Sequence, residues 1–140
     1  MSELNDWNQR VVAEFRANHG RCGGELAGAL MIIVHHVGRK TGTQYENPLV
    51  YQPGPDGRMF LIGSYGGLPK DPAWFGNLLA AGQATVEVGD ETFEVKVTEL
   101  TGAERDTVFE RQKVAMPVFA EYEVKAAGIR TIPILALDRV

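Results

Sequence analysis

Hydrophobic and polar positions alternate along several stretches of the chain, and this pattern predicts strands joined as neighbouring hairpins. The clearest hairpin spans residues 85–98, where apolar residues alternate with polar ones on both sides of a Gly89-Asp90 turn. Proline cannot donate a hydrogen bond within a sheet, so Pro48 and Pro133 indicate edges or bulges in their strands. Together with this hairpin, the pattern predicts further strands over residues 30–37, 44–51, 59–63 and 131–137.

Helical spacing and capping signals predict three helices between these strands. Residues 5–18 carry apolar side chains at roughly helical spacing. Asp71 is the expected N-cap of a second helix that ends at Gly82, and Thr101 with Glu104 reads as a capping box at the start of a third. Since strands dominate and come as hairpins, we expect an antiparallel α+β barrel or sheet.

Length and composition indicate one ordinary globular domain, 1–140, without a repeat or a linker. Of the 140 residues, 44% are hydrophobic and 23% are charged, and the formal net charge is −4. A negative total charge argues against nucleic acid and against membrane surfaces as partners. The single Cys22 excludes an internal disulfide, no apolar run reaches the roughly 18 residues of a membrane span, and the acidic N-terminus differs from a signal peptide. We therefore expect a cytoplasmic protein with no stable membrane insertion.

Two cations stand between glycines at the tip of the predicted 30–51 hairpin, in the stretch Gly38-Arg39-Lys40-Thr41-Gly42. Such a turn can cradle a phosphate, because glycines expose backbone N–H groups while arginine, lysine and a hydroxyl add charge-assisted bonds. Taken alone, the same residues favour a solvated hairpin tip, since glycine and lysine are common there. The loop Gly63-Ser64-Tyr65-Gly66-Gly67 offers a second candidate, since it follows a strand and precedes the start of a helix.

The remaining chemistry-bearing residues favour structural roles. His35 and His36 are adjacent on a strand, so they point to opposite faces and cannot share one metal ion. No metal site is therefore expected, and Cys22 is interpreted as a small buried apolar residue. Tyr122 lies in a short segment, 118–126, with polar neighbours, where it either lines a pocket or covers the end of the barrel.

Taken together and in order, the motifs GRKTG, NPLVY, GSYGGLPKDPAWFGNL, TVEVG and TIPILALDR resemble the deazaflavin-dependent nitroreductase family. This family consists of single-domain split-β-barrel reductases that use the 8-hydroxy-5-deazaflavin coenzyme F420. The similarity extends from about residue 28 to the C-terminus. It implies an antiparallel split barrel with an N-terminal helix and two or three flanking helices.

The resemblance also implies where the coenzyme binds. The basic turn would meet its phosphodiester and oligoglutamate tail, a second segment would run beside its ring system, and the glycine loop with the following helix would close over it. The residues concerned are Arg39, Lys40, Thr41, Pro48, Leu49, Tyr51, Ser64, Tyr65, Gly66, Gly67, Lys70, Trp74 and Asn77.

The activity implied is hydride transfer from the reduced coenzyme to an electron-poor small molecule, namely a quinone, an activated enone or lactone, or a nitro compound. Tyr122 is the candidate proton donor. Family members that reduce nitro compounds carry several tyrosines near the C-terminal pocket, where this chain has one. Two alternatives stay open: a non-catalytic protein that binds the deazaflavin or another flat anion, and an FMN-dependent oxidoreductase on the same barrel. A monomer is expected.

Overall fold

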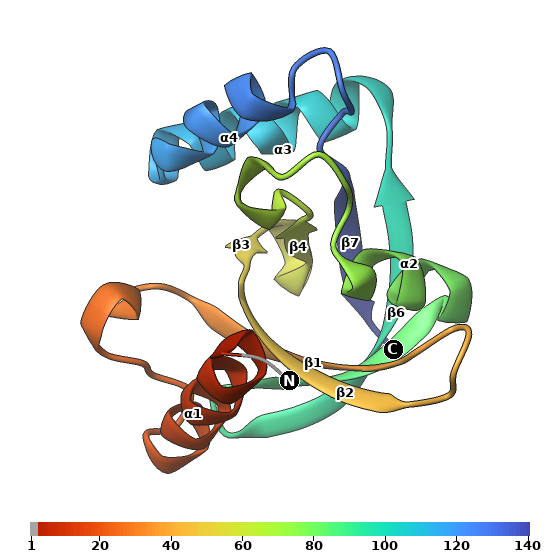
Figure 1. Ribbon diagram of the computed structural model, residues 1–140. Helices are drawn as coiled ribbons and strands as arrows, with labels where there is room; N and C mark the ends of the chain where they lie inside the picture. The colour runs from red at the N-terminus through yellow and green to blue at the C-terminus, as the bar shows by residue number, and fades with distance from the viewer. Residues whose placement is uncertain (1–2) are drawn as a thin grey trace.

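The computed structural model describes residues 3–140, and its frame is a curled antiparallel sheet (Figure 1). Within these residues, seven strands pair in the order β2-β1-β5-β6-β7-β4-β3, and every pair is antiparallel. The predicted antiparallel α+β class is confirmed. The strands are β1 (Met31–Val37), β2 (Gln44–Val50), β3 (Gln52–Pro53), β4 (Met59–Ile62), β5 (Gln83–Val88), β6 (Glu91–Leu100) and β7 (Ile134–Arg139).

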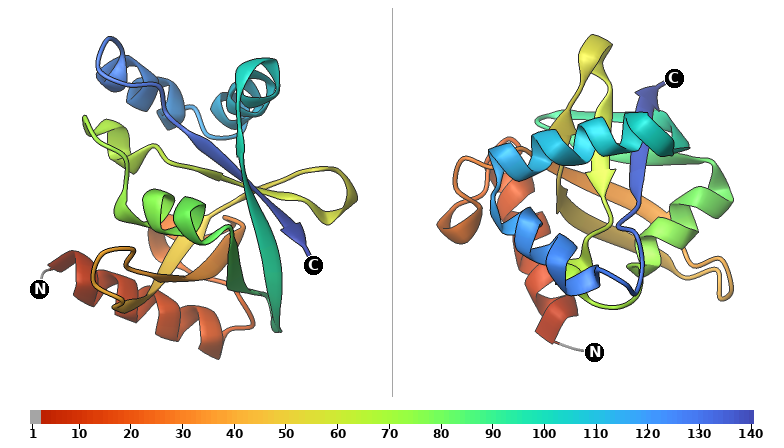
Figure 2. Two further views of the ribbon diagram at one scale, coloured as in Figure 1. Left: turned by 90° about the vertical axis from the view of Figure 1, so that its right-hand side faces the viewer. Right: turned by 90° about the horizontal axis from the view of Figure 1, so that it is seen from above.

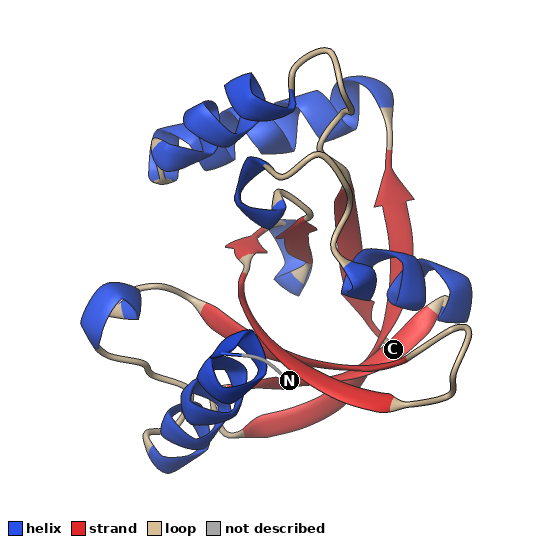
Figure 3. Cartoon of the chain, viewed as in Figure 1, coloured by secondary structure: helices blue, strands red, loops and turns tan. Residues whose placement is uncertain are grey.

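In the part of the chain that the structure describes, four α-helices surround the sheet (Figure 3). One helix packs beside the hairpin of β1 and β2, and two lie together at the opposite end of the molecule (Figures 1 and 2). Short 3-10 turns occupy three of the loops. The helices are α1 (Glu3–Ala17), α2 (Ala73–Ala81), α3 (Gly102–Ala115) and α4 (Val118–Ala126), and the 3-10 turns are η1 (Gly24–Leu26), η2 (Pro55–Gly57) and η3 (Tyr65–Gly67).

Strands β1 and β7 are buried on both of their faces, which explains why they read as continuous apolar runs, whereas β6 alternates because one of its faces is exposed. Side chains alternate between faces along a strand. Ile32 and Val34 enter the cluster around α2, whereas Met31 and Ile33 pack against α1. The side chains of strand β7 alternate in the same way. Leu135 and Leu137 face α2, whereas Ile134 and Ala136 face helices α3 and α4. The hydrophobic cores on the two faces therefore share one sheet.

Several local predictions were right. Strand β2 lies at one edge of the sheet, as Pro48 indicated. Gly82 ends α2 in the left-handed conformation, with φ of 74°. Cys22 is buried against α1, and burial raises the pKa of its thiol. Among the described residues, no helix is both long and apolar enough to cross a membrane.

Other predictions were wrong in detail. Asp71 does not cap α2, because its carboxylate pairs with Arg130 at 2.9 Å and Pro72 occupies the N-cap position. Thr101 is the N-cap of α3, yet its side chain makes no capping hydrogen bond, and Glu104 pairs with Arg58 instead. The last strand starts after Pro133 rather than including it, so this proline marks neither an edge nor a bulge. Strand β7 is instead a central strand, paired on both sides.

Candidate functional site

A cleft of about 780 Å³ opens between the β1–β2 hairpin, the loop after β4, and helices α1, α2 and α4. It extends along the hairpin, because its lining includes Met31 and Val50 at one end and the turn with Arg39 at the other. Seven-residue strands separate these ends by roughly 20 Å. The cleft is therefore an elongated groove that fits a long, flat ligand.

Arg39 is fixed at the turn end of the cleft by helix α2. Its Nη1 donates to Oδ1 of Asn77 at 2.8 Å and to the carbonyl of Ala73 at 3.5 Å, and its backbone N–H donates to the same Asn77 oxygen at 3.1 Å. The guanidinium lies directly on Gly76, where a Cβ would come within 2.7 Å of Cζ. A glycine in α2 therefore allows the cation to pack on the helix and still line the cleft.

A hydrogen-bond network of Asn77, His36 and Asn47 connects Arg39 to strands β1 and β2. Asn77 Nδ2 donates to Nδ1 of His36 at 3.0 Å, and Nε2 of His36 contacts Oδ1 of Asn47 at 2.7 Å. His36 and Asn77 are 7% and 5% exposed, so the network is shielded from water. Burial is the main reason that the pKa of His36 lies below its ordinary value. All three residues line the cleft, as does Tyr45, whose ring stacks on His36.

Lys40 and Thr41 complete the basic turn. Lys40 is exposed and borders the cleft. Thr41 accepts a hydrogen bond from the backbone N–H of Thr43 and folds over Gly38, where a Cβ would lie 2.7 Å from its hydroxyl oxygen. The turn is thus a folded structure that presents two cations beside the cleft.

The glycine loop after β4 lies across the cleft from this turn. Tyr65, Gly66 and Gly67 have φ angles of 48°, 63° and 80°, a conformation that is costly for tyrosine. Arg130 holds the loop, because its guanidinium donates to the carbonyls of Gly63, Ser64 and Leu68 at 2.8–3.1 Å. The strained tyrosine is therefore kept at the cleft by an arginine more than sixty residues further along the chain.

Helix α4 provides an apolar wall. Phe119 and Tyr122 line the cleft and pack edge to face, with ring centroids 5.2 Å apart. Met116 and Val118 continue this wall, and Trp7 from α1 also lines the cleft. The cleft is thus polar at the basic turn and apolar towards α1 and α4.

The structure brings most of the predicted site residues together. Three of them lie outside the cleft lining. Tyr51 packs against the core around α2, where burial raises its pKa. Gly67 is buried beneath α4, where a Cβ would lie 3.0 Å from Lys125, and Lys70 is exposed. Those that line the cleft are Arg39, Lys40, Thr41, Pro48, Leu49, Ser64, Tyr65, Gly66, Trp74, Asn77 and Tyr122.

Sequence reasoning missed His36, Asn47, Gly76 and Arg130. Two of these left a signal. His36 has the same strand parity as Ile32 and therefore faces the α2 side, and a glycine inside a helix is often a sign of close packing. Asn47 and Arg130 left none, since their partners come from distant segments.

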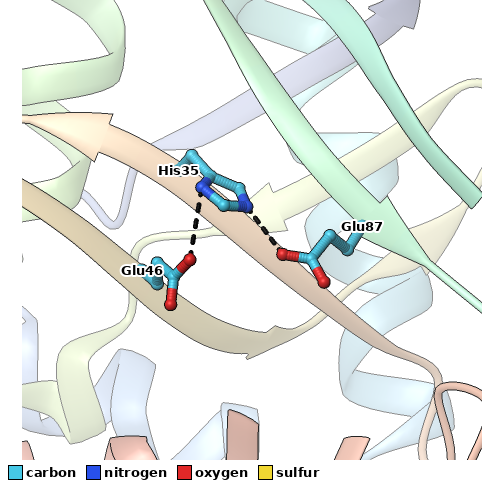
Figure 4. A group of neighbouring side chains, drawn as sticks. All are labelled: His35, Glu46 and Glu87. Carbon is cyan, nitrogen blue, oxygen red and sulfur yellow. Dashed lines mark hydrogen bonds and ion pairs between the residues drawn. The ribbon is translucent and has the colours of Figure 1, made fainter. Parts of the chain in front are cut away.

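His35, on the other face of β1, belongs to a separate cluster (Figure 4). Its Nε2 lies 2.7 Å from Oε2 of Glu87, and its Nδ1 lies 3.6 Å from Glu46. These three side chains have the spacing of metal ligands, but the guanidinium of Arg16 contacts both carboxylates at 2.6–2.8 Å. These contacts hold the pKa of Glu87 below its ordinary value. A cation is already present, so we interpret the cluster as an ion-pair network that docks α1 on the sheet.

The fold and the cleft define a class: a half-barrel protein whose curled sheet carries a groove with a basic turn. Comparison with known proteins identifies the family. Residues 7–138 match the model of the F420H(2)-dependent quinone reductases, and the chain belongs to that family. The resemblance to deazaflavin-dependent reductases is therefore confirmed, and the matching family is that of the F420H(2)-dependent quinone reductases.

Individual relatives support the assignment. An F420H(2)-dependent quinone reductase of Mycobacterium tuberculosis is 35% identical over 85 residues, which cover 59% of this chain and 56% of that protein. The alignment thus spans little more than half of the relative. A solved F420-H2 dependent reductase, FDR-A, has a TM-score of 0.67 at 29% identity, over 77% of this chain and 93% of the other.

A second solved chain, described as a domain-swapped dimer, has a TM-score of 0.69 at 26% identity and covers 96% of both chains. The fold prediction of a split barrel is consistent with these neighbours. The expectation of a monomer finds no support in the second one.

Proposed function

We propose that this protein binds the reduced deazaflavin coenzyme F420H2 in the cleft and catalyses the two-electron reduction of a quinone. The single observation behind the proposal is the division of one elongated cleft into a cationic end and an apolar end. Family membership supplies the identity of the coenzyme and the class of acceptor. When bound, the coenzyme would supply a hydride.

The residues of the cationic end fit the coenzyme's phosphodiester and carboxylate tail. Arg39 keeps N–H donors beyond those used by Asn77 and Ala73, and Lys40 adds an exposed charge. The net charge of the protein is −4, so an anion needs such local cations. We place the tail against the turn and the ring system beside Pro48 and Leu49.

The apolar end fits a quinone. Trp7, Met116 and Phe119 line this part of the cleft and would exclude water from a flat acceptor. Residues 116–126 contain one tyrosine, Tyr122, which we assign as the proton donor. A hydride and a proton together convert a quinone to a hydroquinone, and Tyr122 Oη would deliver the proton to a quinone oxygen. Activated enones, lactones and nitro compounds are further candidate acceptors of the same electron-poor class.

Steady-state assays test the proposal. Purified protein is mixed with F420H2 and a soluble quinone, and the return of the oxidised coenzyme's visible absorbance is followed. We expect saturable turnover with the quinone, and parallel assays with an enone, a lactone and a nitroaromatic rank the other acceptors. Tight coenzyme binding without turnover on any acceptor would favour a non-catalytic deazaflavin-binding protein instead.

A further inference from the structure

Arg39 determines which atoms donate and which accept in the hydrogen bonds around His36. The backbone N–H and Nη1 of Arg39 can only donate, so the Asn77 atom that faces them must be the carbonyl oxygen. The amide nitrogen of Asn77 then faces Nδ1 of His36 at 3.0 Å. Because that nitrogen is a donor, Nδ1 must carry a lone pair.

The same direction continues to the other side of the imidazole ring. A neutral histidine with a lone pair on Nδ1 carries its proton on Nε2, so Nε2 donates to Oδ1 of Asn47 at 2.7 Å. This bond turns the Nδ2 donor of Asn47 away from His36, and Asn47 lines the cleft. One imidazole thus determines how two asparagine amides point.

We propose that His36 is a positioning residue which, as the neutral Nε2–H tautomer, fixes the Arg39 guanidinium through Asn77 and presents the Asn47 amide to the anionic ligand. His36 touches neither the hydride donor nor the acceptor in this assignment. It acts on coenzyme affinity, and this part of the inference depends on the proposed function. The Nε2–H tautomer of His36 and its effect on the orientation of Asn77 do not depend on the proposed function.

Protonation of His36 would break the arrangement. A proton on Nδ1 would face the Asn77 N–H donor, so the amide would have to rotate and withdraw its oxygen from Arg39. Burial, which lowers the pKa of His36, keeps the ring neutral at pH 7. The charged or titratable groups around the ring are Arg39, the stacked Tyr45, and His35 on the opposite face of the strand.

The first test uses the ligand-free protein and NMR of the histidine ring nitrogens. We expect His36 to show a protonated Nε2 and an unprotonated Nδ1 at pH 7. In the Asn77→Asp variant a carboxylate oxygen replaces the amide donor, so Nδ1 gains an acceptor and the titration midpoint of His36 should rise by at least one pH unit. A protonated Nδ1 in the native protein, or an unchanged midpoint in Asn77→Asp, overturns the proposal.

The second test measures affinity for oxidised F420 between pH 5 and pH 8. His36→Phe keeps a ring against Tyr45 but cannot orient the amides, and we expect at least tenfold weaker binding at pH 7. His19→Phe, at an exposed histidine outside the cleft lining, is the control and should stay within twofold of native protein. The ratio of native to His36→Phe affinity should shrink as pH falls, since native protein alone loses the ordered network.

Equal affinity of His36→Phe and native protein, or a pH-independent ratio, contradicts the positioning role. Melting curves of both variants confirm that they are folded before affinities are compared. If native protein binds no F420 at all, the proposed function fails. The NMR experiment on the ligand-free protein still tests the His36 tautomer independently.

Discussion

Arg39 shows how one side chain serves both structure and binding. Its contacts with Asn77 and with the Ala73 carbonyl anchor the β1–β2 turn to α2, and Gly76 leaves room for the guanidinium. An arginine held in this way loses less conformational freedom when it binds an anion. Lys40, which is exposed, contributes mainly through charge.

Replacing Arg39 and Lys40 together with alanine should weaken F420 affinity at least tenfold. Hydrogen bonds to charged groups contribute about 1.5–3 kcal/mol each. Fluorescence titration of the coenzyme measures the effect. The control is the double variant Lys96→Ala and Arg111→Ala, which makes the same change in net charge at exposed positions outside the cleft lining. Equal dissociation constants for the two double variants would mean that the turn does not contact the coenzyme.

Tyr122 has a different expected role. Changing Tyr122 to phenylalanine keeps the ring that packs against Phe119 and removes only the hydroxyl. Turnover with a quinone should fall about a hundredfold or more, because general acid catalysis typically contributes about 10²–10⁴-fold. The dissociation constant of F420 should change less than twofold. Unaltered turnover would remove Tyr122 from the proton-donor role.

At the scale of elements, helix α1 is the wall of the cleft that packs against β1 on the face opposite α2. Val11, Val12 and Phe15 bury its inner face, while Arg16 in its last turn binds Glu87 on β5 and Glu46 on β2, the two strands that flank β1. The position of Trp7 and of the apolar end of the cleft therefore depends on both packing and ion pairs.

The ion pairs make the docking of α1 dependent on pH. The folded-state pKa of Glu87 is depressed below its ordinary value of 4.5, so its stabilising contribution is present above about pH 4.5 and is lost as the pH falls through the lower folded value. Arg16→Gln should lower the free energy of unfolding by about 1 kcal/mol at pH 7 and by less at pH 3. Denaturant unfolding at both pH values measures this difference. An equal loss at pH 7 and pH 3 would contradict the ion-pair account.

At the scale of the whole molecule, the alternation of apolar residues predicted most of the fold. Hairpins 30–51 and 85–98 appear where local sequence signals placed them, because strand pairing across a short turn is a local property. The boundaries of β7 and the caps of α2 and α3 were less predictable. Arg130 and Arg58 engage the expected capping carboxylates through contacts distant in the sequence.

The site was predictable in part for the same reason. The basic turn and the glycine loop are continuous in sequence and carry visible signals. The network of His36, Asn47 and Asn77 joins β1, β2 and α2, and only the folded chain brings these elements together. Resemblance to a family supplied the coenzyme, which residue patterns alone left as an unspecified anion.

The most direct test of the account is a fluorescence titration of the purified protein with oxidised F420, alongside an FMN titration under the same conditions. We predict saturable F420 binding that weakens with added salt, since charged contacts at Arg39 and Lys40 contribute to it, and no comparable binding of FMN. Preferential binding of FMN would contradict it and would favour an FMN-dependent oxidoreductase on the same barrel. Binding of neither would leave the half-barrel fold without the proposed cofactor.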